Sequence, residues 1–250
     1  MTQQRTQIAS HRGGALDWPE NSPTAFRNTT KLDVEQVEFD VHPTTDHRLA
    51  VIHDATLDRT TDGAGPVSVN SFAELQRFTL KRTGGERILP LEDLIEIFRP
   101  TPILLRLEIK PDHERRPYPD SPRLVSDLLK AKEVLDRTIV TSFQIETLDR
   151  LREHGAPRGV IWLVSPFVLG DIGLADVIAV ANAHRVPALS IQQTVLDPGV
   201  VKTVRDAGLG IGGWAAHDDA AITKMLHLGV DVFTSDRPTR AVELRAEFRP

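Results

Sequence analysis

The stretch that decides the fold is residues 138–164, TIVTSFQIETLDRLREHGAPRGVIWLV. It begins with a β-rich run, Thr138–Ser142, continues with helical periodicity over Gln144–His154, and ends with a second apolar run, Gly159–Val164. Gly155 stands where the helix should end, because glycine is common just after helices. A strand, a helix and a strand joined by short links indicate one βαβ unit of a parallel sheet.

The same alternation continues along the rest of the chain. Eight strands are predicted, at Gln7–Arg12, Glu35–Val41, Ile103–Lys110, Thr138–Ser142, Gly159–Val164, Ala188–Ile191, Gly210–Ala215 and Val230–Ser235. Helical patterns lie near Ser22–Lys31, Ser121–Lys132, Gln144–His154, Leu174–His184, Pro198–Ala207, Asp218–Leu228 and Pro238–Glu247. This order favours an α/β fold, a (β/α)8 TIM-type barrel, over an open doubly wound sheet, in one domain covering residues 1–250.

One segment departs from the alternation. Leu49–His53 follows the second strand after too few residues for a helical crossover, which needs at least about 10–12 residues. We therefore expect a hairpin that turns near Asp46-His47 and returns His53 to the level of Asp40. Residues 55–102 then form a small insertion in a loop at the C-terminal mouth of the barrel. Two short helical patterns are predicted within it, Ser71–Phe78 and Leu91–Phe98.

Composition excludes several classes of protein. With 250 residues, 40% hydrophobic and 26% charged side chains, the chain is neither disordered nor collagen-like. A net charge of -5 without a Lys- or Arg-rich cluster argues against a nucleic-acid partner. The absence of Cys excludes disulfides and thiolate metal sites, which points toward hard cations such as Mg²⁺ or Ca²⁺. The N-terminus has no apolar signal core, and the longest uncharged stretch, Gly159–Gly170, is too short to span a bilayer. We therefore expect a cytoplasmic protein with no stable membrane insertion.

Acidic side chains are predicted to point into the barrel. Because side chains alternate along a strand, Glu38 and Asp40 share the inward face of the second strand. By the same count, Arg106, Glu108 and Lys110 point inward from the third strand. Three unpaired carboxylates would be costly to bury near the strand ends. Two interpretations remain open: the carboxylates bind a divalent cation, or they form salt bridges with neighbouring Arg and Lys side chains and hold no metal.

A series of short motifs occurs in a fixed order along the same elements. It comprises His11-Arg12-Gly13, Pro19-Glu20-Asn21-Ser22, Glu38-Phe39-Asp40-Val41, Thr45-Asp46, His53-Asp54, Leu57-Asp58-Arg59-Thr60-Thr61-Asp62-Gly63, Leu107-Glu108-Ile109-Lys110, Thr141-Ser142-Phe143, Gly213-Trp214, Leu228-Gly229-Val230-Asp231 and Thr234-Ser235-Asp236-Arg237-Pro238. Each motif is weak alone, but together they closely resemble the glycerophosphodiester phosphodiesterase family from residue 8 to about 240. The resemblance implies a metal-dependent hydrolase on a phospholipase-C-like barrel that cleaves glycerophosphodiesters to glycerol 3-phosphate and an alcohol.

The resemblance also implies a role for each matching residue. The implied ligands of one divalent cation, Mg²⁺ or Ca²⁺, are Glu38, Asp40 and Glu108. The implied acid–base pair is His11 and His53, and the implied phosphate contacts are Arg12 and Lys110. Two imidazoles that titrate near neutral pH can supply one base and one acid. We expect His11 to be the base and His53 the acid.

Several residues around these motifs have two interpretations each. Glu20 and Asn21 either cap and fix a loop or hold the metal carboxylates or the substrate in place. Trp214 either packs in the barrel or forms a wall for the glycerol or the leaving alcohol. Asp54 either orients His53 or caps the following turn. The remaining histidines are expected to be structural or on the surface: His42, His47, His113, His154, His184 and His227, with His217 near the mouth as a further candidate for substrate contact.

Two departures from the family pattern stand out: the first leaves the shape of a turn open, and the second leaves the leaving group open. His47 stands where the family usually has Gly, and Ala215-Ala216-His217 replaces a run that more often contains Thr and Asn. The alternative functions are a lysophospholipase D, a phosphodiesterase for another substrate such as a sugar-containing phosphodiester, and a catalytically silent barrel. An enzyme with a small-molecule phosphodiester substrate is favoured, because all the reactive groups are present. The sequence does not indicate an oligomeric state.

Overall fold

The computed structural model describes residues 5–249, so part of the N-terminal stretch examined for a signal core lies outside the described residues. Eight parallel strands form a ring: β1 (Gln7–Ser10), β2 (Gln36–Pro43), β5 (Leu104–Ile109), β6 (Thr138–Ser142), β7 (Gly159–Val164), β8 (Ala188–Gln192), β9 (Gly210–Trp214) and β10 (Val232–Ser235). Their order is β1-β10-β9-β8-β7-β6-β5-β2, and β1 also pairs with β2. The predicted (β/α)8 barrel is therefore confirmed.

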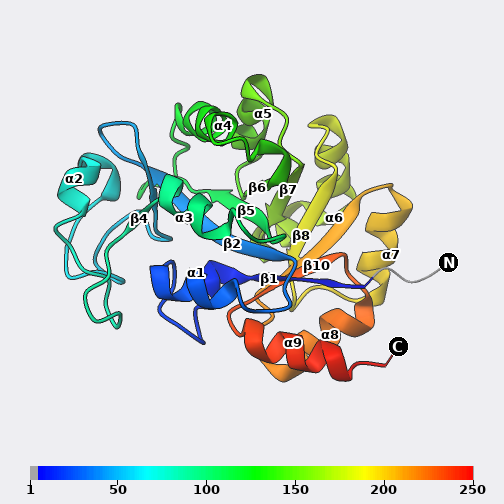
Figure 1. The fold of residues 1–250 in the computed structure, drawn as a ribbon. Coiled ribbons are helices and arrows are strands. Elements are labelled where there is room, and N and C mark those ends of the chain that lie inside the picture. Colours follow the sequence, from blue (N-terminus) through cyan, green and yellow to red (C-terminus); the bar gives the residue numbers. More distant parts are fainter. Residues whose placement is uncertain (1–4, 250) are drawn as a thin grey trace.

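The helices lie around the outside of this ring (Figure 1). They are α1 (Pro23–Thr29), α3 (Leu91–Phe98), α4 (Ser121–Ala131), α5 (Ile145–His154), α6 (Pro166–Ala183), α7 (Pro198–Asp206), α8 (Asp219–Leu228) and α9 (Pro238–Glu247). Several begin at a polar cap: Ser22, Asp197 and Asp218 each accept a hydrogen bond from the amide three residues later. Such caps satisfy amides that would otherwise have no partner in the first helical turn.

Helix α6 differs from the expected Leu174–His184, because it begins earlier, at Pro166, and is interrupted by Gly173 with φ 78° and ψ 162°. By length and composition it could cross a membrane: its mean hydropathy is 1.5, and only 17% of it is buried. It also connects β7 to β8, which pair in parallel, so it is the crossover helix of this βαβ unit.

The predicted hairpin is present. Strand β3 (Leu49–Val51) runs antiparallel to β2, with Val41 opposite Val51, and β4 (Leu89–Pro90) pairs with β3. The Ile52 amide donates to the Asp40 carbonyl at 3.1 Å, which brings His53 to the barrel mouth as expected. Between β3 and β4 lie the 3₁₀ turn Val67–Val69 and the short helix α2 (Phe72–Leu75), in the segment that extends away from the barrel in Figure 1.

The second half of the expected insertion packs on the barrel instead. Leu91, Leu94, Ile95 and Phe98 of α3 belong to the main apolar core, where the Phe98 ring meets Phe26 edge to face at 6.0 Å. The insertion has its own cluster, which includes Ile52, Leu57, Val67, Phe72, Leu75, Leu80 and Ile88. Apolar periodicity identified the helix at 91–98 but could not show which of the two cores it covers.

Candidate active site

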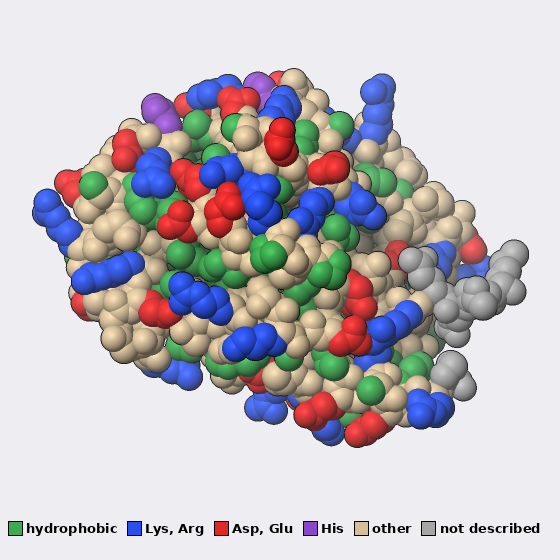
Figure 2. All heavy atoms as spheres, in the orientation of Figure 1, with side chains coloured by type: hydrophobic (Ala, Val, Ile, Leu, Met, Phe, Trp, Pro, Cys, Tyr) green, Lys and Arg blue, Asp and Glu red, His purple; other side chains and the backbone are tan. Residues whose placement is uncertain are grey.

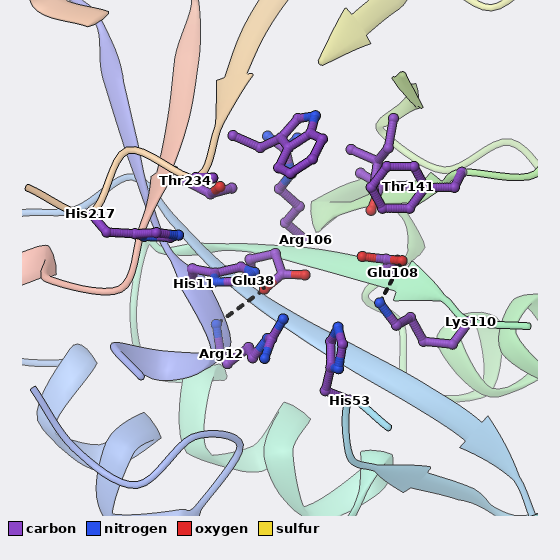
Figure 3. Close-up of a pocket in the computed structure, with 14 residues that line it drawn as sticks. His11, Arg12, Glu38, His53, Arg106, Glu108, Lys110, Thr141, His217 and Thr234 are labelled. Carbon is purple, nitrogen blue, oxygen red and sulfur yellow. Dashed lines mark hydrogen bonds and ion pairs between the residues drawn. The ribbon is translucent and has the colours of Figure 1, made fainter. Parts of the chain in front are cut away.

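A cavity of about 220 Å³ opens at the C-terminal end of the barrel. One part of its lining is charged and comes from β1, β2, β5 and the loops that follow them; it includes His11, Arg12, Glu38, His53, Arg106, Glu108 and Lys110 (Figure 3). Another part is apolar and consists of Phe143, Leu163, Trp214 and Ala215. The charged part of the lining suits a phosphate group, and the apolar part suits a small organic substituent on it.

The three predicted carboxylates lie together at this cavity. Glu38, Asp40 and Glu108 are 3%, 0% and 5% exposed, and one oxygen from each lies within 4.8 Å of the others. Asp40 Oδ1 is buried without a hydrogen-bond partner among residues 5–249. Oxygen ligands converging in this way suit a hard divalent cation.

Elements of the salt-bridge alternative are present as well. Lys110 Nζ lies 2.8 Å from Glu108 Oε1 and 3.4 Å from Asp40 Oδ1, and Arg12 Nε lies 3.6 Å from Asp40 Oδ2. These two cations leave the carboxylates incompletely neutralised. Burial and the charge of Asp40 raise the pKa of Glu38 to about 7. Burial alone would raise the pKa of Asp40 too, but Lys110 is the main opposing influence and holds it well below its usual range.

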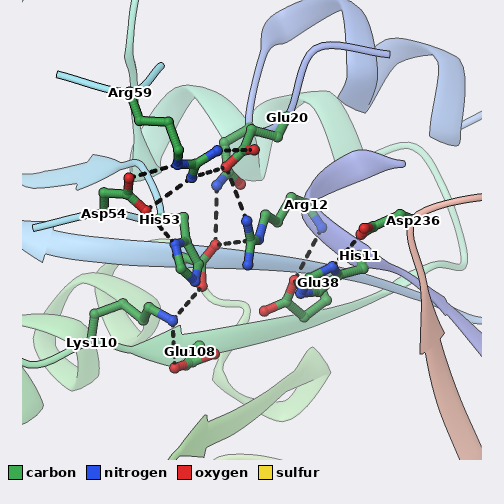
Figure 4. A network of polar contacts seen from close by, with 12 residues as sticks. His11, Arg12, Glu20, Glu38, His53, Asp54, Arg59, Glu108, Lys110 and Asp236 are labelled. Carbon is green, nitrogen blue, oxygen red and sulfur yellow. Dashed lines mark hydrogen bonds and ion pairs between the residues drawn. The ribbon is translucent and has the colours of Figure 1, made fainter. Parts of the chain in front are cut away.

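Both catalytic candidates pair with a carboxylate through Nδ1 (Figure 4). His11 Nδ1 hydrogen-bonds Asp236, and His53 Nδ1 lies 2.7 Å from Asp54 Oδ1. The Nε2 atom of each imidazole is therefore the one left for substrate, and His11 Nε2 lies 3.7 Å from Glu38. Burial lowers the pKa of His11, but Glu38 and Asp236 outweigh it and raise that pKa above its usual value.

Asp54 and Glu20 are joined by a residue that sequence analysis missed. Arg59, from the insertion, donates two hydrogen bonds to Asp54 at 2.7 and 2.9 Å and two to Glu20 at 2.6 and 2.8 Å. Glu20 Oε1 also accepts from Arg12 Nη1 at 3.1 Å. A continuous chain of contacts therefore runs from His53 through Arg59 to Arg12 (Figure 4). Arg59 belongs to the motif at residues 57–63, and this motif was the sequence signal that could have identified it.

The loop after β1 has a tight local shape. The strand ends at Ser10 rather than at the expected Arg12, and a 3₁₀ turn follows with Arg12 at φ 50° and Gly13 at φ 74°. A Cβ at Gly13 would lie 2.9 Å from the Ala25 Cβ, so only glycine fits without a shift. This turn directs the Arg12 amide to Glu38 Oε2 at 3.1 Å.

Asn21 and Trp214 also lie close to the centre. Asn21 is 2% exposed and donates to Asp40 Oδ2 at 3.1 Å, so it contacts a candidate metal ligand. Trp214 donates through Nε1 to the Val164 carbonyl at 3.3 Å and meets Phe143 edge to face, which makes an apolar wall of the cavity.

Two further histidines support the centre. His217 Nδ1 accepts from the Asp236 amide at 3.1 Å, and its ring stacks on His11 at 5.8 Å. His42 is fully buried, and its Nε2 donates to the His53 carbonyl at 3.1 Å. Burial lowers the pKa of His42 to about 4, so it is neutral at pH 7 and has the structural position expected of it.

Known proteins share both the sequence pattern and the fold. A profile of the glycerophosphoryl diester phosphodiesterase family matches residues 11–240. A glycerophosphodiester phosphodiesterase of Bacillus altitudinis is 29% identical over 98% of this chain and 100% of its own length. A crystal structure from Agrobacterium tumefaciens, assigned as a glycerophosphoryl diester phosphodiesterase, is 40% identical and covers 97% of this chain and 98% of that chain, with a TM-score of 0.95.

A more distant structure carries a ligand. It is a phosphodiesterase of Oleispira antarctica in complex with the product sn-glycerol 3-phosphate, 22% identical over 97% of each chain, with a TM-score of 0.79. At this identity the likeness concerns the fold. Because the family profile covers most of the described residues, including the carboxylates and both imidazoles, this chain belongs to the glycerophosphoryl diester phosphodiesterase family and shares its enzyme class, the phosphoric diester hydrolases.

Proposed function

We propose that this chain hydrolyses glycerophosphodiesters to glycerol 3-phosphate and an alcohol, with one divalent cation, Mg²⁺ or Ca²⁺. The observation that carries the proposal is the cluster of three buried carboxylates beside two Asp–His pairs. The buried Asp40 Oδ1 has no hydrogen-bond partner among residues 5–249, although it lies 3.4 Å from Lys110 Nζ. This atom and the raised pKa of Glu38 both fit a cation held by Glu38, Asp40 and Glu108. When bound, such a cation supplies charge neutralisation for the phosphate.

Cationic side chains supply the remaining neutralisation. Arg12 and Lys110 line the cavity on both sides of the carboxylates and are held there by Glu20 and Glu108. A phosphodiester resists attack because its oxygens are negative, so cations fixed beside those oxygens lower the barrier. We assign these two residues to the phosphate.

The two imidazoles supply the proton transfers. In our proposal His11 Nε2 accepts the proton of the attacking oxygen, and His53 Nε2 gives a proton to the leaving alkoxide as the P–O bond breaks. Asp236 and Asp54 hold the two rings in orientation. The attacking oxygen is either water or the 2-hydroxyl of the glycerol, and a substrate without that hydroxyl distinguishes the two routes.

The apolar wall suits the glycerol carbons, and the rim above it favours a second candidate. Phe143 is 38% exposed, Phe167 83% and Leu16 55%. All three follow the C-terminal ends of barrel strands, at the mouth. An acyl chain could bury these side chains, which supports lysophospholipase D activity as the alternative.

A substrate panel with a metal control tests these proposals. Purified protein is incubated with glycerophosphocholine, a glycerophosphosugar and lysophosphatidylcholine, with and without EDTA, and the phosphomonoester products are measured. We expect glycerol 3-phosphate from the first substrate and its loss on complete metal removal. Turnover that persists without metal would contradict the metal role. Dominant release of lysophosphatidate would instead support the alternative.

Variants test the residues directly. His11→Ala and His53→Ala should each fold and lose about 100-fold or more in kcat, because each removes a proton-transfer group. Rates near those of the unmodified protein would contradict the assignment.

We also propose that the protein works in the cytoplasm on a small-molecule phosphodiester. On the face shown in Figure 2, acidic and basic side chains are intermixed.

A further inference from the structure

The floor of the cavity contains a buried cation that the proposed mechanism does not use. Arg106 lies on β5, two residues before Glu108 and therefore deeper in the barrel, and is only 1% exposed. It lines the cavity, and its Nη1 and Nη2 atoms have no hydrogen-bond partner among residues 5–249. Figure 3 shows it between Thr141 and Thr234, and the Thr234 Oγ1 is likewise without a partner in the described part of the chain.

This arrangement favours a ligand with acceptor oxygens. A guanidinium has five N–H donors and no acceptor, and burying charged donors unpaired is costly. The charges of Glu38 and Glu108 act on Arg106 through space, but neither carboxylate accepts a hydrogen bond from its Nη atoms. Two carboxylates that serve a cation are not free to pair with Arg106 as well.

We propose that Arg106 and Thr234 form a subsite for a carboxylate on the alcohol that stays in the cavity as the phosphomonoester product. The preferred substrates would then be phosphodiesters of a three-carbon hydroxy acid, with a carboxylate where glycerol has a hydroxymethyl group. The Nη groups of Arg106 donate to the carboxylate oxygens, and the Thr234 hydroxyl donates to one of them. This inference rests on the proposed function, because it places the phosphate at the carboxylate cluster.

Calorimetric binding of two products tests the subsite without measuring turnover. The probes are glycerate 3-phosphate and sn-glycerol 3-phosphate, titrated into the Mg²⁺-loaded protein and its Arg106→Met and Arg106→Lys variants. We expect the unmodified protein to bind glycerate 3-phosphate about tenfold or more tightly than glycerol 3-phosphate, the range of a charge-assisted hydrogen bond. Arg106→Met should abolish this preference with little change for glycerol 3-phosphate, and Arg106→Lys should restore part of it.

Each other outcome overturns the subsite in a recognisable way. Equal or weaker binding of glycerate 3-phosphate by the unmodified protein refutes it and leaves the proposed function intact. An equal loss for both probes in Arg106→Met makes Arg106 a structural counter-ion. Binding of neither probe refutes the subsite, and the glycerophosphodiester turnover assay then decides the proposed function separately. If Arg106→Met does not fold, Thr234→Val provides the second variant, with a smaller expected loss of the preference.

Discussion

Replacing Glu38 by Gln should change how the stability of the metal-free protein depends on pH. Glu38 is 3% exposed beside Asp40, and these surroundings raise its pKa from 4.5 to about 7. A carboxyl group with a raised pKa holds its proton more tightly in the folded state. Its contribution to stability is therefore fully present below about pH 4.5 and is lost as pH rises through about 7. Glutamine resembles the protonated form at every pH.

The size of the effect follows from the shift. A difference of one pKa unit corresponds to about 1.4 kcal/mol, so the shift of Glu38 corresponds to about 3 kcal/mol in the free energy of unfolding. The Glu38→Gln variant should match the unmodified protein near pH 4.5 and exceed it by about this amount near pH 8. A divalent cation should reverse the order, because only the unmodified protein keeps all three ligands.

Urea unfolding in EDTA at several pH values between about 5 and 8 measures this difference. The comparison between the two proteins is needed because other groups titrate in the same range. The pKa of His42 is lowered to about 4, which makes stability rise with pH and opposes the trend from Glu38. Subtracting the two profiles removes His42. A difference that stays constant from pH 5 to pH 8 would refute the reasoning.

Three further predictions concern the surroundings of the centre. Asp236→Asn should lower kcat about 100-fold with little change in KM, because it disturbs the orientation of His11; a change confined to KM in steady-state kinetics would contradict this. Arg59→Ala should lower kcat/KM about tenfold or more, because it removes the contacts that hold Asp54 and Glu20. The control variant Arg82→Ala, at an exposed position of the same insertion, should have no effect on kcat/KM. Equal rates for the two variants would exclude a positioning role for Arg59. Gly13→Ala should reduce the free energy of unfolding by about 1–3 kcal/mol in urea titrations, because alanine is strained at φ 74° and meets Ala25; unchanged stability would show that the turn relaxes.

The carboxylate cluster was predictable because it depends on the alternation of side chains along two strands. That rule placed Glu38 and Asp40 on one face and Glu108 on the matching face of the next barrel strand. What the sequence could not supply is the register. Asp40 pairs with Glu108 across β2 and β5, while Glu38 pairs with Arg106. This register brings the three carboxylates together and places Arg106 deeper in the barrel than Glu108.

The missed residues reach the site through loops. Arg59 contacts Glu20 across 39 positions of sequence, and Asp236 contacts His11 across 225. Periodicity describes how one element faces its neighbours, but it does not show which loop side chains meet above the barrel. Both residues belong to the family motifs, so the sequence pointed to them but did not show which side chains they contact.

Closure of the barrel completes the candidate active site. Strands β1 and β10 join the two ends of the chain, with Ser10 opposite Ser235. The residue that follows each strand is His11 or Asp236, so the pairing that seals the barrel also brings this Asp–His pair together. The carboxylates depend on a different seam, between β2 and β5. The proposed cation ligands and the proposed base therefore depend on separate strand pairings, and Arg12, which follows His11 and contacts Asp40, connects them.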